Sequence, residues 1–598
     1  MPELQFKGKE FVYNHHLTVP FRPLEPDAAR GIGEPALDGN LIIHGDNLHA
    51  LKALLPTHAG KVDCIFIDPP YNTGNEGWAY NDNVNSPMIR EWLAANPIGL
   101  EDGLRHDKWL CMMWPRLTLL HELLAEDGSL WITLDDNEAH RTISILEEIF
   151  GADNLAGQIT WRSSDNSNND SKSFSTDKNY ILVASKSKDW LPNKLDAPEK
   201  RGHFKNPDND PRGPWFDGNP VDSPSPRPNL IFDLTTPSGK SIKPPRNGWR
   251  WERSEIDAKL ATGEMRFNSE ETRILRRTYL HEMKGLPPSD LWIDLERYGH
   301  NRAAKYELQS MFGGISPFQT PKPTKLLSAI LNVATHENAL ILDSFAGSGT
   351  TAHAVLAANA RDGGNRRFIL VEGEDYADTL TAERVRRIIH GYAFTGTQRE
   401  ELLREPITFS KLKQANSLLE QVQRIETLDG PRYDRIKSTV KDGALIVTGE
   451  RDVKEKTPGL GGTFTYCTLG APVEMDAILT GKTLPSVEAM AGLLWHTATA
   501  KPFDAANMTA APDLGDGAMR LGEMAGLTYW LFYKPDLEWL KSAEAALTLT
   551  RARTIGALPG DHLVFAPAKF VSRELLGREK LAVDYAPLPF ALYRLEMA

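Results

Sequence analysis

A short apolar run that ends in Asp-Pro-Pro-Tyr constrains this chain more than any other feature. Residues 62–68, VDCIFID, form a continuous apolar segment, which is typical of a strand buried on both faces of a parallel sheet. Pro69 and Pro70 stiffen the chain directly after this strand, where open α/β sheets bind their ligands. The sequence therefore predicts a ligand-binding turn at residues 68–71, which we call the DPPY turn.

Strand and helix patterns alternate on both sides of the DPPY turn. The apolar periodicity predicts strands at 129–135, 179–187 and 366–374, and helices at 107–126, 136–151, 322–335 and 382–392. Residues 339–360 are typical of a strand, a glycine-rich turn and a helix in succession. The alternation predicts an α/β protein with a doubly wound sheet.

Composition narrows the class of protein. A chain of 598 residues is too long for one core, and no run of about 18 apolar residues predicts a membrane span. Only three cysteines occur, which excludes a disulfide scaffold and is typical of a reducing cytoplasm. No His/Cys cluster has zinc spacing, so we predict no metal site. The net charge of -12 argues against a wholly basic nucleic-acid binder but leaves local basic surfaces open.

The segment after residue 190 differs from the rest. Twelve prolines lie between 191 and 250, and residues 186–253 hold thirteen Lys/Arg against nine Asp/Glu. Trp190, Trp215, Trp249 and Trp251 lie in or beside this stretch. Two interpretations stay open: a long surface insertion, or a nucleic-acid contact surface, because cations suit phosphates and aromatic rings suit bases.

A second ligand-binding turn is predicted at residues 343–351, DSFAGSGTT, which we call the glycine turn. Glycines let a ligand approach the backbone closely, and the helix that follows offers free N–H groups. The next strand ends in Glu372, and a carboxylate at that place commonly accepts hydrogen bonds from ribose hydroxyls. The pair favours a nucleoside-containing cofactor over the alternatives, an ordinary α/β turn and a solvated strand end.

The DPPY turn offers two acceptors and a ring. The Asp68 carboxylate and the Pro69 carbonyl accept hydrogen bonds, and Tyr71 adds a flat π-face. This combination describes a clamp for the exocyclic amine of a planar base. Hydrogen bonds from both N–H protons favour a tetrahedral nitrogen whose lone pair can attack a methyl group. The alternative is a proline-stiffened turn with a structural aspartate.

Together, DPPY at 68–71 and FAGSGT at 345–350 resemble the signature pair of S-adenosylmethionine-dependent amino-methyltransferases that act on DNA. DPPY comes first, which resembles the beta group, a circular permutation of the usual methyltransferase sheet. The longer strings DPPYNTGNEGWAYND and FAGSGTTAHAVLAAN resemble the modification subunit of type III restriction-modification systems. The resemblance covers about residues 38–160 and 310–395. It implies a circularly permuted Rossmann-like sheet with S-adenosylmethionine as cofactor.

The resemblance also implies roles for single residues. Asp68, Pro69, Pro70 and Tyr71 match the catalytic motif, with the flipped target base stacked on Tyr71. Asp rather than Ser at position 68 implies adenine N6 rather than cytosine N4 as the target. The positions expected to bind the cofactor are Asp46, Asn47, Asp343, Phe345, Ala346, Gly347, Gly349, Thr350, Glu372 and Lys322. Residues 316–327 depart from the family's HPTQKP-type segment, because Ser316 replaces the usual His and Gln319 lies further from Lys322.

Five segments are expected along the chain: an N-terminal arm at 1–37, methyltransferase core at 38–189, a target-recognition domain at 190–310, further core at 311–398, and a C-terminal α/β domain at 399–598. We expect the core sheet to be complete by about residue 395. The last segment is expected to bind a partner or to support self-association, and the alternative is a self-contained accessory domain. The resemblance implies double-stranded DNA as substrate, a homodimer, and a helicase-nuclease restriction subunit as partner.

Three other functions are weighed against this one. The chain could be the methyltransferase of another phage-defence system, a catalytically silent DNA-recognition subunit, or an enzyme that methylates amines of RNA or protein. The intact DPPY and FAGSGT motifs argue against the silent subunit.

Overall fold

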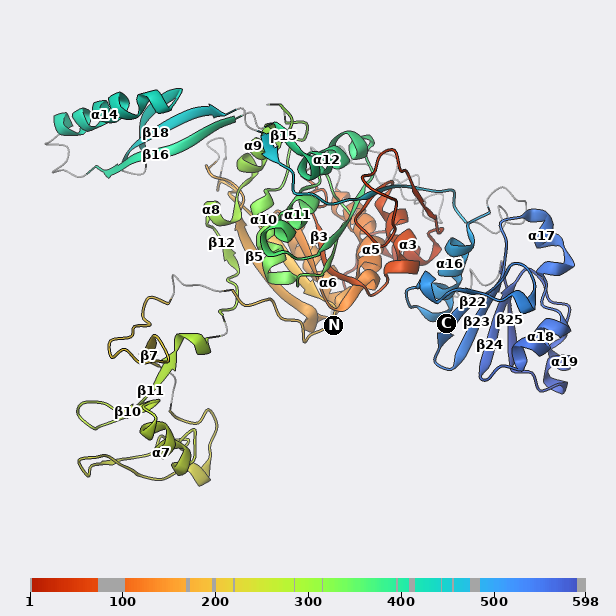
Figure 1. Cartoon of the computed structure of the whole chain (residues 1–598), viewed down its shortest axis with the longest axis horizontal. Helices are drawn as coiled ribbons and strands as arrows, with labels where there is room; N and C mark the ends of the chain where they lie inside the picture. Colours follow the sequence, from red (N-terminus) through yellow and green to blue (C-terminus); the bar gives the residue numbers. More distant parts are fainter. Residues whose placement is uncertain are drawn as a thin grey trace. The chain divides into compact units, whose positions relative to one another are not determined.

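The structure is a computed structural model in which the chain forms two compact units, Met1–Leu191 with Ser289–Ala598, and Pro192–Pro288 (Figure 1). It describes residues 3–73, 103–167, 173–195, 201–218, 221–283, 285–313, 316–393, 396–407, 415–441, 444–453, 456–473 and 484–588. The end of the string DPPYNTGNEGWAYND therefore lies outside the described residues. No helix in the described part of the chain is long and apolar enough to cross a membrane.

A ten-stranded sheet forms the centre of the first unit, and it confirms the predicted α/β fold. Its order is β1 (Leu24–Pro26), β20 (Thr465–Leu469), β2 (Leu41–His44), β14 (Arg367–Glu372), β13 (Leu340–Asp343), β3 (Val62–Ile67), β4 (Leu124–Leu134), β6 (Lys178–Ser185), β5 (Leu155–Arg162) and β12 (Leu291–Trp292). From β20 to β4 all neighbours are parallel. β6 is antiparallel to both β4 and β5.

Two distant parts of the chain meet in the middle of this sheet. β13 pairs with β14 on one side and with β3 on the other, although nearly 300 residues separate β3 from β13. Both strands are parallel, so their carboxyl ends reach the same edge of the sheet. The DPPY turn and the glycine turn therefore begin side by side.

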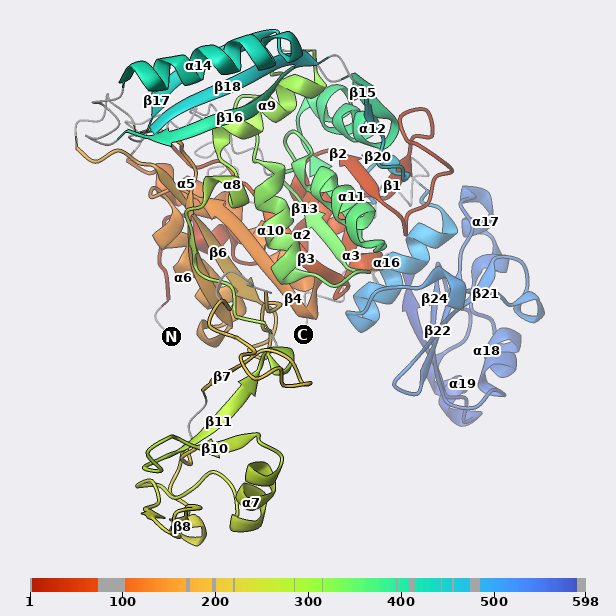
Figure 2. The ribbon, with the colours of Figure 1, turned by 60° about the vertical axis from the view of Figure 1, so that its left-hand side comes forward.

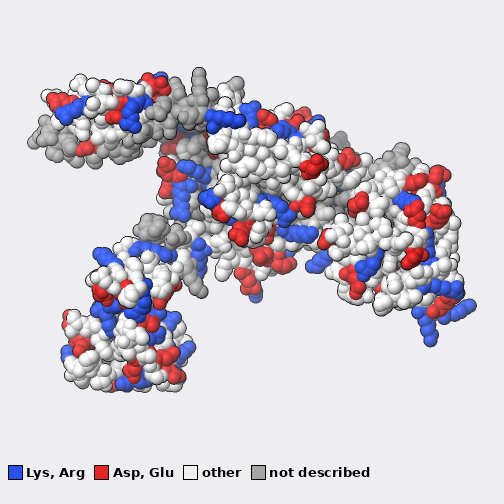
Figure 3. Space-filling view, viewed as in Figure 1, with Lys and Arg blue, Asp and Glu red and all other residues white. Residues whose placement is uncertain are grey.

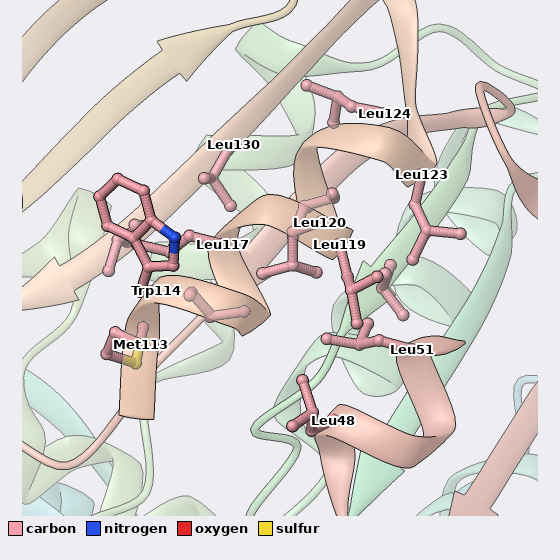
Figure 4. Close-up of a cluster of buried hydrophobic side chains, with 14 of the residues drawn as sticks. Leu48, Leu51, Met113, Trp114, Leu117, Leu119, Leu120, Leu123, Leu124 and Leu130 are labelled. Carbon is pink, nitrogen blue, oxygen red and sulfur yellow. The ribbon is translucent and has the colours of Figure 1, made fainter. Parts of the chain in front are cut away.

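Helices cover both faces of the sheet. On one face α3 (Asn47–His58), α5 (Arg105–Leu123) and α6 (Ala139–Phe150) bury an apolar cluster, in which Leu51 of α3 lies beside Leu119 of α5 (Figure 4). On the other face α10 (Thr324–Ala334) packs against α11 (Thr350–Asp362), next to α12 (Glu383–His390) (Figure 2). Pro115 lies inside α5, which continues past it without a break.

The expectation that the core sheet is complete by about residue 395 is wrong. Thr465–Leu469 forms β20, which pairs in parallel with β2, and β1 from the N-terminal segment covers β20 in turn. Without β20 the buried strand β2 would present an unpaired edge, which is unfavourable for its backbone N–H and C=O groups. Residues on both sides of the expected core, 1–37 and 399–598, thus contribute to its sheet.

Residues 399–598 contain two further structures besides β20. β16 (Gly396–Pro406), β18 (Ala444–Val453) and β17 (Arg435–Lys441) form an antiparallel sheet along which α14 (Ala415–Asp429) lies (Figure 2). A five-stranded sheet follows, in the order β21 (Thr509–Ala510), β22 (Ala518–Met524), β23 (Leu527–Phe532), β24 (Asp561–Ala566) and β25 (Val583–Pro587). Near this sheet α16 (Val487–Thr499) contacts α3.

The second unit, Pro192–Pro288, has a small core of its own. It contains the strands β7 (Trp215–Asp217), β8 (Leu234–Thr235), β9 (Ser241–Ile242), β10 (Met265–Phe267) and β11 (Ile274–Tyr279) and the helix α7 (Arg253–Ala261). The unit ends earlier than the expected boundary at residue 310. Residues 291–311 instead form β12, α8 (Leu295–Tyr298) and α9 (Asn301–Met311) of the first unit, where Trp292 is buried and stacks on Tyr298.

Candidate active site

The Asp68 carboxylate lies at the centre of the DPPY turn and is bonded on both oxygens. Oδ1 accepts hydrogen bonds from the hydroxyls of Tyr71 at 3.0 Å and Thr133 at 2.5 Å. Oδ2 forms an ion pair with Lys322. Thr133 belongs to β4, the strand next to β3, and Lys322 lies just before α10. Three separate segments therefore hold one carboxylate at the edge of the sheet.

Lys322, which the resemblance implied as a cofactor-binding residue, contacts the DPPY turn directly. Its ammonium group contacts Asp68 and lies 5.1 Å from the centre of the Tyr71 ring, and its role in cofactor binding stays a prediction. The side chain is buried, and an ammonium group in such a place needs an opposite charge. Lys322 is therefore built into the DPPY turn itself.

Tyr71 is held by its hydroxyl as well as by packing. The hydroxyl donates to Asp68 and accepts from Nδ2 of Asn179 at 3.2 Å. Burial, followed by the negative charge of Asp68, raises the pKa of Tyr71 well above its ordinary value, so the hydroxyl keeps its proton. These contacts orient the ring beside the carboxylate, and its stacking role stays a prediction.

A second group of contacts holds the DPPY turn from behind. The Pro70 carbonyl accepts from Nε1 of Trp109 at 2.7 Å. Asn72 has a left-handed backbone with φ of 61°, which asparagine tolerates better than most residues. Its Nδ2 donates to Glu138 Oε1 at 2.5 Å and to the Arg105 carbonyl at 3.2 Å. The start of α5 and the residue before α6 thus fix the exit of the turn.

Glu138 is fully buried and lies within hydrogen-bonding distance of His106. The two groups lie 2.5 Å apart, between Oε1 of Glu138 and Nδ1 of His106. Burial raises the pKa of Glu138 to about 7, while burial and the charges of Arg141 and Arg105 lower the pKa of His106. Both directions favour a neutral pair with the proton on the carboxyl. No sequence signal pointed to this pair, because its members lie 32 residues apart. His106 is at the start of α5, and Glu138 directly precedes α6.

The glycine turn has a left-handed backbone at two of its glycines. Gly347 and Gly349 adopt φ of 51° and 76°, and a Cβ at Gly347 would come within 3.1 Å of the Phe318 ring. The Gly347 N–H donates to Oε2 of Glu372 at 2.7 Å. Glycine is required here both for the left-handed conformation and for the close ring, and the turn meets the predicted acid on the neighbouring strand.

Three carboxylates gather where β3, β13 and β14 end. Asp343 is buried and accepts from the Phe345 N–H at 3.1 Å and from the Thr351 hydroxyl at 2.5 Å. Burial, despite these bonds, and the charges of Asp68 and Glu372 raise the pKa of Asp343 to about 7. Burial also raises the pKa of Glu372. A positively charged ligand at this edge would relieve the mutual repulsion of these groups.

Asp46 and Asn47 join the start of α3 to the glycine turn. Asp46 caps α3 by accepting from the N–H groups of Leu48 and His49. Nδ2 of Asn47 donates to the Ser344 carbonyl at 3.1 Å. The sequence did not single out Arg116, which is buried in α5 and donates from Nε to Asn47 Oδ1 at 2.5 Å.

The other predicted positions lie around the same edge. Pro69 and Ala346 are buried, and Phe345 packs against the core cluster that α3 and α5 share. The Thr350 hydroxyl donates to the Lys322 carbonyl at 3.2 Å and accepts from Nη1 of Arg384 at 2.8 Å. Thr350 therefore links the glycine turn to the segment that carries Lys322.

Comparison with known proteins identifies the family. Residues 62–383 match a family model described as DNA methylase, of the N6 and N4 type. The chain belongs to this family. The matched range contains both the DPPY turn and the glycine turn, and it also contains the whole Pro192–Pro288 unit. It excludes Asp46, β20 and the structures that follow β20.

Curated relatives include type III Mod subunits and type II methyltransferases. The chain is 30% identical to the type III restriction-modification enzyme StyLTI Mod subunit of Salmonella typhimurium over 425 residues, 64% of this chain and 62% of that protein. It is 30% identical to the EcoPI Mod subunit of Escherichia phage P1, over 56% and 58% of the two chains. It is 31% identical to the type II methyltransferase M.KpnI of Klebsiella pneumoniae, over 55% of this chain and 79% of that enzyme. The chain thus spans about three fifths of the length of the type III subunits it matches.

Among solved structures, PvuII DNA methyltransferase (cytosine-N4-specific) aligns over 58% of this chain and 86% of that protein. The sequence identity is 13% and the TM-score is 0.32, so no argument is drawn from this likeness.

Proposed function

We propose that this DNA methylase transfers a methyl group from S-adenosylmethionine to N6 of adenine in DNA. The observation that carries the proposal is the pairing of β3 with β13, because it brings an amine-accepting carboxylate, Asp68, next to the glycine turn. An acceptor for the target base and a turn suited to a nucleoside cofactor then share one sheet edge.

The residues at this edge fit the cofactor by their charges and donors. Glu372 would accept from the ribose hydroxyls, and Asp46 would lie near the adenine, as the resemblance implies. The buried acid Asp343 would be more stable as an anion beside a cationic group. S-Adenosylmethionine supplies such a cation and a methyl group with a good leaving group.

The two oxygens of Asp68 would have different tasks. Oδ1 already accepts from Tyr71 and Thr133, so these bonds fix the orientation of the carboxylate. Oδ2, which faces Lys322, is the oxygen that would accept a hydrogen bond from one N–H of the target amine, while the Pro69 carbonyl would accept a hydrogen bond from the other N–H. Tyr71 would stack on the flipped base. Alignment of these groups is then the main source of rate acceleration.

The test is a change in genomic DNA. The full chain is expressed in a bacterial host without DNA methylases. The nucleosides of the host DNA are then separated and identified by mass spectrometry. We expect N6-methyladenine, and its absence with the Asp68→Ala variant. N4-methylcytosine would overturn the choice of base, and unmodified DNA with a folded, cofactor-binding protein would overturn the proposal.

For the Pro192–Pro288 unit we propose target recognition. It holds seventeen Lys/Arg and fourteen Asp/Glu, and Figure 3 shows both signs interspersed on its surface. Trp215 and Trp249 are buried, so they cannot stack on bases as the sequence suggested. Arg277 lies over Trp215 and pairs with Asp208. The exposed cations of the unit are therefore better candidates than these two tryptophans, and exchanging 192–288 for the same segment of a relative should change the methylated sequence.

We further propose that the chain works with a restriction subunit and forms a dimer, because the StyLTI and EcoPI relatives are named as subunits of type III restriction-modification enzymes. Deleting residues 484–598 leaves β20 in place, unlike a truncation at 398, and so tests the last sheet without removing a strand of the core sheet. Loss of the dimer mass in light scattering, or of co-purification with a helicase-nuclease chain, would assign that role to the last sheet. A deletion variant that keeps both would leave it an accessory domain.

A further inference from the structure

A hollow of about 450 Å³ in the surface of the first unit has no role in the contacts described so far. Five of its lining residues come from α9 and the sixth from the segment before α10: Asn301, Arg302, Lys305, Tyr306, Gln309 and Gln319. The opposite face of α9 is buried through Ala304, Leu308 and Met311. The lining residues therefore recur every three or four positions on the outward face of one helix.

The chemistry of the lining suits a nucleotide. It combines three carboxamides, two cations and the ring of Tyr306, which is 59% exposed. Carboxamides hydrogen-bond base edges, cations neutralise phosphates, and an exposed ring stacks on a base. In Figure 3, Lys and Arg side chains gather on the core at the places of α8 and α9. Arg302 is also paired with Asp165 at 2.9 Å, which orients its guanidinium at the rim.

Hydrogen bonds connect the hollow to the catalytic tyrosine. The Asn301 N–H donates to the Ser163 carbonyl at 3.0 Å, and Ser163 Oγ donates to Asn179 Oδ1 at 3.3 Å. The amide of the same Asn179 donates to the Tyr71 hydroxyl. The first residue of α9 is thus two side chains away from the DPPY turn.

A second connection runs along the chain. Gln319 lies three positions before Lys322, whose ammonium group contacts Asp68. From the inner face of α9, Glu307 accepts from Nη2 of Arg384 at 3.0 Å, which ties α9 to α12. The hollow is therefore linked to the DPPY turn through hydrogen bonds and through the segment 319–322, and its helix is firmly held.

We propose that this hollow binds a nucleotide of the DNA strand that carries the target base, next to that base. Tyr306 stacks on the base of this nucleotide, Lys305 contacts its phosphate, and Gln309 and Gln319 face its polar edge. The inference rests on the proposed function and adds a DNA contact that is separate from the Pro192–Pro288 unit. It makes the first unit a reader of the immediate neighbour of the target.

The test uses the full chain and unmethylated genomic DNA from a methylase-free host. Tyr306→Ala should raise the DNA concentration for half-maximal methylation about tenfold or more, because stacking on one base is lost. Tyr306→Phe should stay within about twofold of the wild type, since the ring is kept. Lys305→Ala should lower the slope of log affinity against log salt by about one. The cofactor affinity and the rate at saturating DNA should not change.

Matched controls come from exposed positions far along the chain. Phe570 is 64% exposed and Lys541 has an exposed side chain. Phe570→Ala therefore removes an aromatic ring, as Tyr306→Ala does, and Lys541→Ala removes one positive charge, as Lys305→Ala does. Thermal unfolding of each variant confirms that it folds. Tyr306→Ala and Lys305→Ala proteins that bind and methylate DNA like these controls would overturn the proposal.

Two further outcomes distinguish a failure of the nucleotide site from a failure of the proposed methyltransferase function. A wild type that methylates no DNA fails the proposed function before the hollow is tested. If Lys305→Ala alone weakens DNA binding, and Tyr306→Ala binds DNA like the wild type, the nucleotide site is overturned in favour of a simple phosphate contact.

Discussion

The DPPY turn and the glycine turn follow neighbouring strands of one sheet, yet they are held in different ways. Asp68 is fixed by the side chain of Tyr71 in the same turn and by side chains from two distant places in the chain, Thr133 and Lys322. The glycine turn is fixed mainly by its own backbone, with the left-handed Gly347 and Gly349 and a bond from the Gly347 N–H to Glu372. One turn depends on charge and side-chain geometry, and the other on backbone conformation.

This difference predicts which function a substitution damages in each turn. Removing a side chain from the DPPY turn should damage chemistry while leaving the backbone intact. Changes near the glycine turn should damage ligand binding instead. Variants at four positions test this contrast, and they are ordered by the expected size of their effect.

The largest effect is expected for Asp68→Ala. Loss of the acceptor for the target amine should lower the single-turnover rate of methyl transfer by about a hundredfold or more. Cofactor affinity, measured by calorimetry, should change by no more than about threefold. Asn at this position is the matched control, because it keeps the volume. A fall in cofactor affinity as large as the fall in rate would remove the contrast between the turns.

Glu372→Ala should act on the other turn. The variant loses the predicted acceptor of the ribose hydroxyls and the partner of the Gly347 N–H. Bonds to a charged group are worth about 1.5–3 kcal/mol, so the cofactor Kd should rise about 10- to 100-fold. The rate at saturating cofactor should fall much less. Equal cofactor binding by the variant and the wild type would show that Glu372 serves only the turn.

Tyr71 variants sharpen the account of the DPPY turn. Tyr71→Ala should lower the rate about tenfold because the stacking ring is lost. Tyr71→Phe keeps the ring but loses the bonds to Asp68 and Asn179, so we expect a loss of about threefold. The rates are compared at saturating cofactor. If Phe were as harmful as Ala, the hydroxyl and not the ring would carry the role.

The smallest effect on rate is expected for Glu138→Gln, whose signature is a change in stability with pH. The folded pKa of Glu138 is raised to about 7 from the ordinary 4.5. The stability that its protonated form contributes is fully present below pH 4.5 and is lost as pH rises through about 7. Glutamine does not titrate. The free energy of unfolding of the variant, relative to that of the wild type, should therefore rise between pH 5 and pH 8, by at most about 3 kcal/mol.

Urea denaturation at both pH values measures this gain, and Glu126→Gln is the control because Glu126 is exposed. If the difference between Glu138→Gln and the wild type did not depend on pH, the pKa of Glu138 would not be raised in the folded protein.

The two turns also differ in how far they could be predicted. Gly347, Gly349 and Glu372 were identified from a glycine pattern and a strand end, and the structure brings them into direct contact. For the DPPY turn the sequence indicated Asp68 and Tyr71, but it did not predict the contact of Lys322 with Asp68 and missed Thr133. The cluster of Asn72, Glu138 and His106 was also missed, because buried polar partners leave no periodic pattern in a sequence.

Domain limits show the same division on a larger scale. The composition of residues 191–250 indicated an insertion, and the Pro192–Pro288 unit lies there. The residues after this unit, 291–311, and the strand β20 belong to the core unit, although we expected them in the target-recognition domain and in the C-terminal domain. Trp292 and the short strands beside it carry too few residues for a pattern, and only the open edges of the sheet decide where they pair.

By itself the sequence determined the α/β class, the places of the two turns and the family, because buried strands, glycine conformations and proline stiffness act within a few residues. The tertiary structure decided which strands are neighbours, and with that the order that sets β3 beside β13. It also decided that Lys322 meets Asp68 across 254 positions of the chain. The physical reason is that a buried charge needs a partner, and only the packing of the whole sheet determines which distant group is within reach.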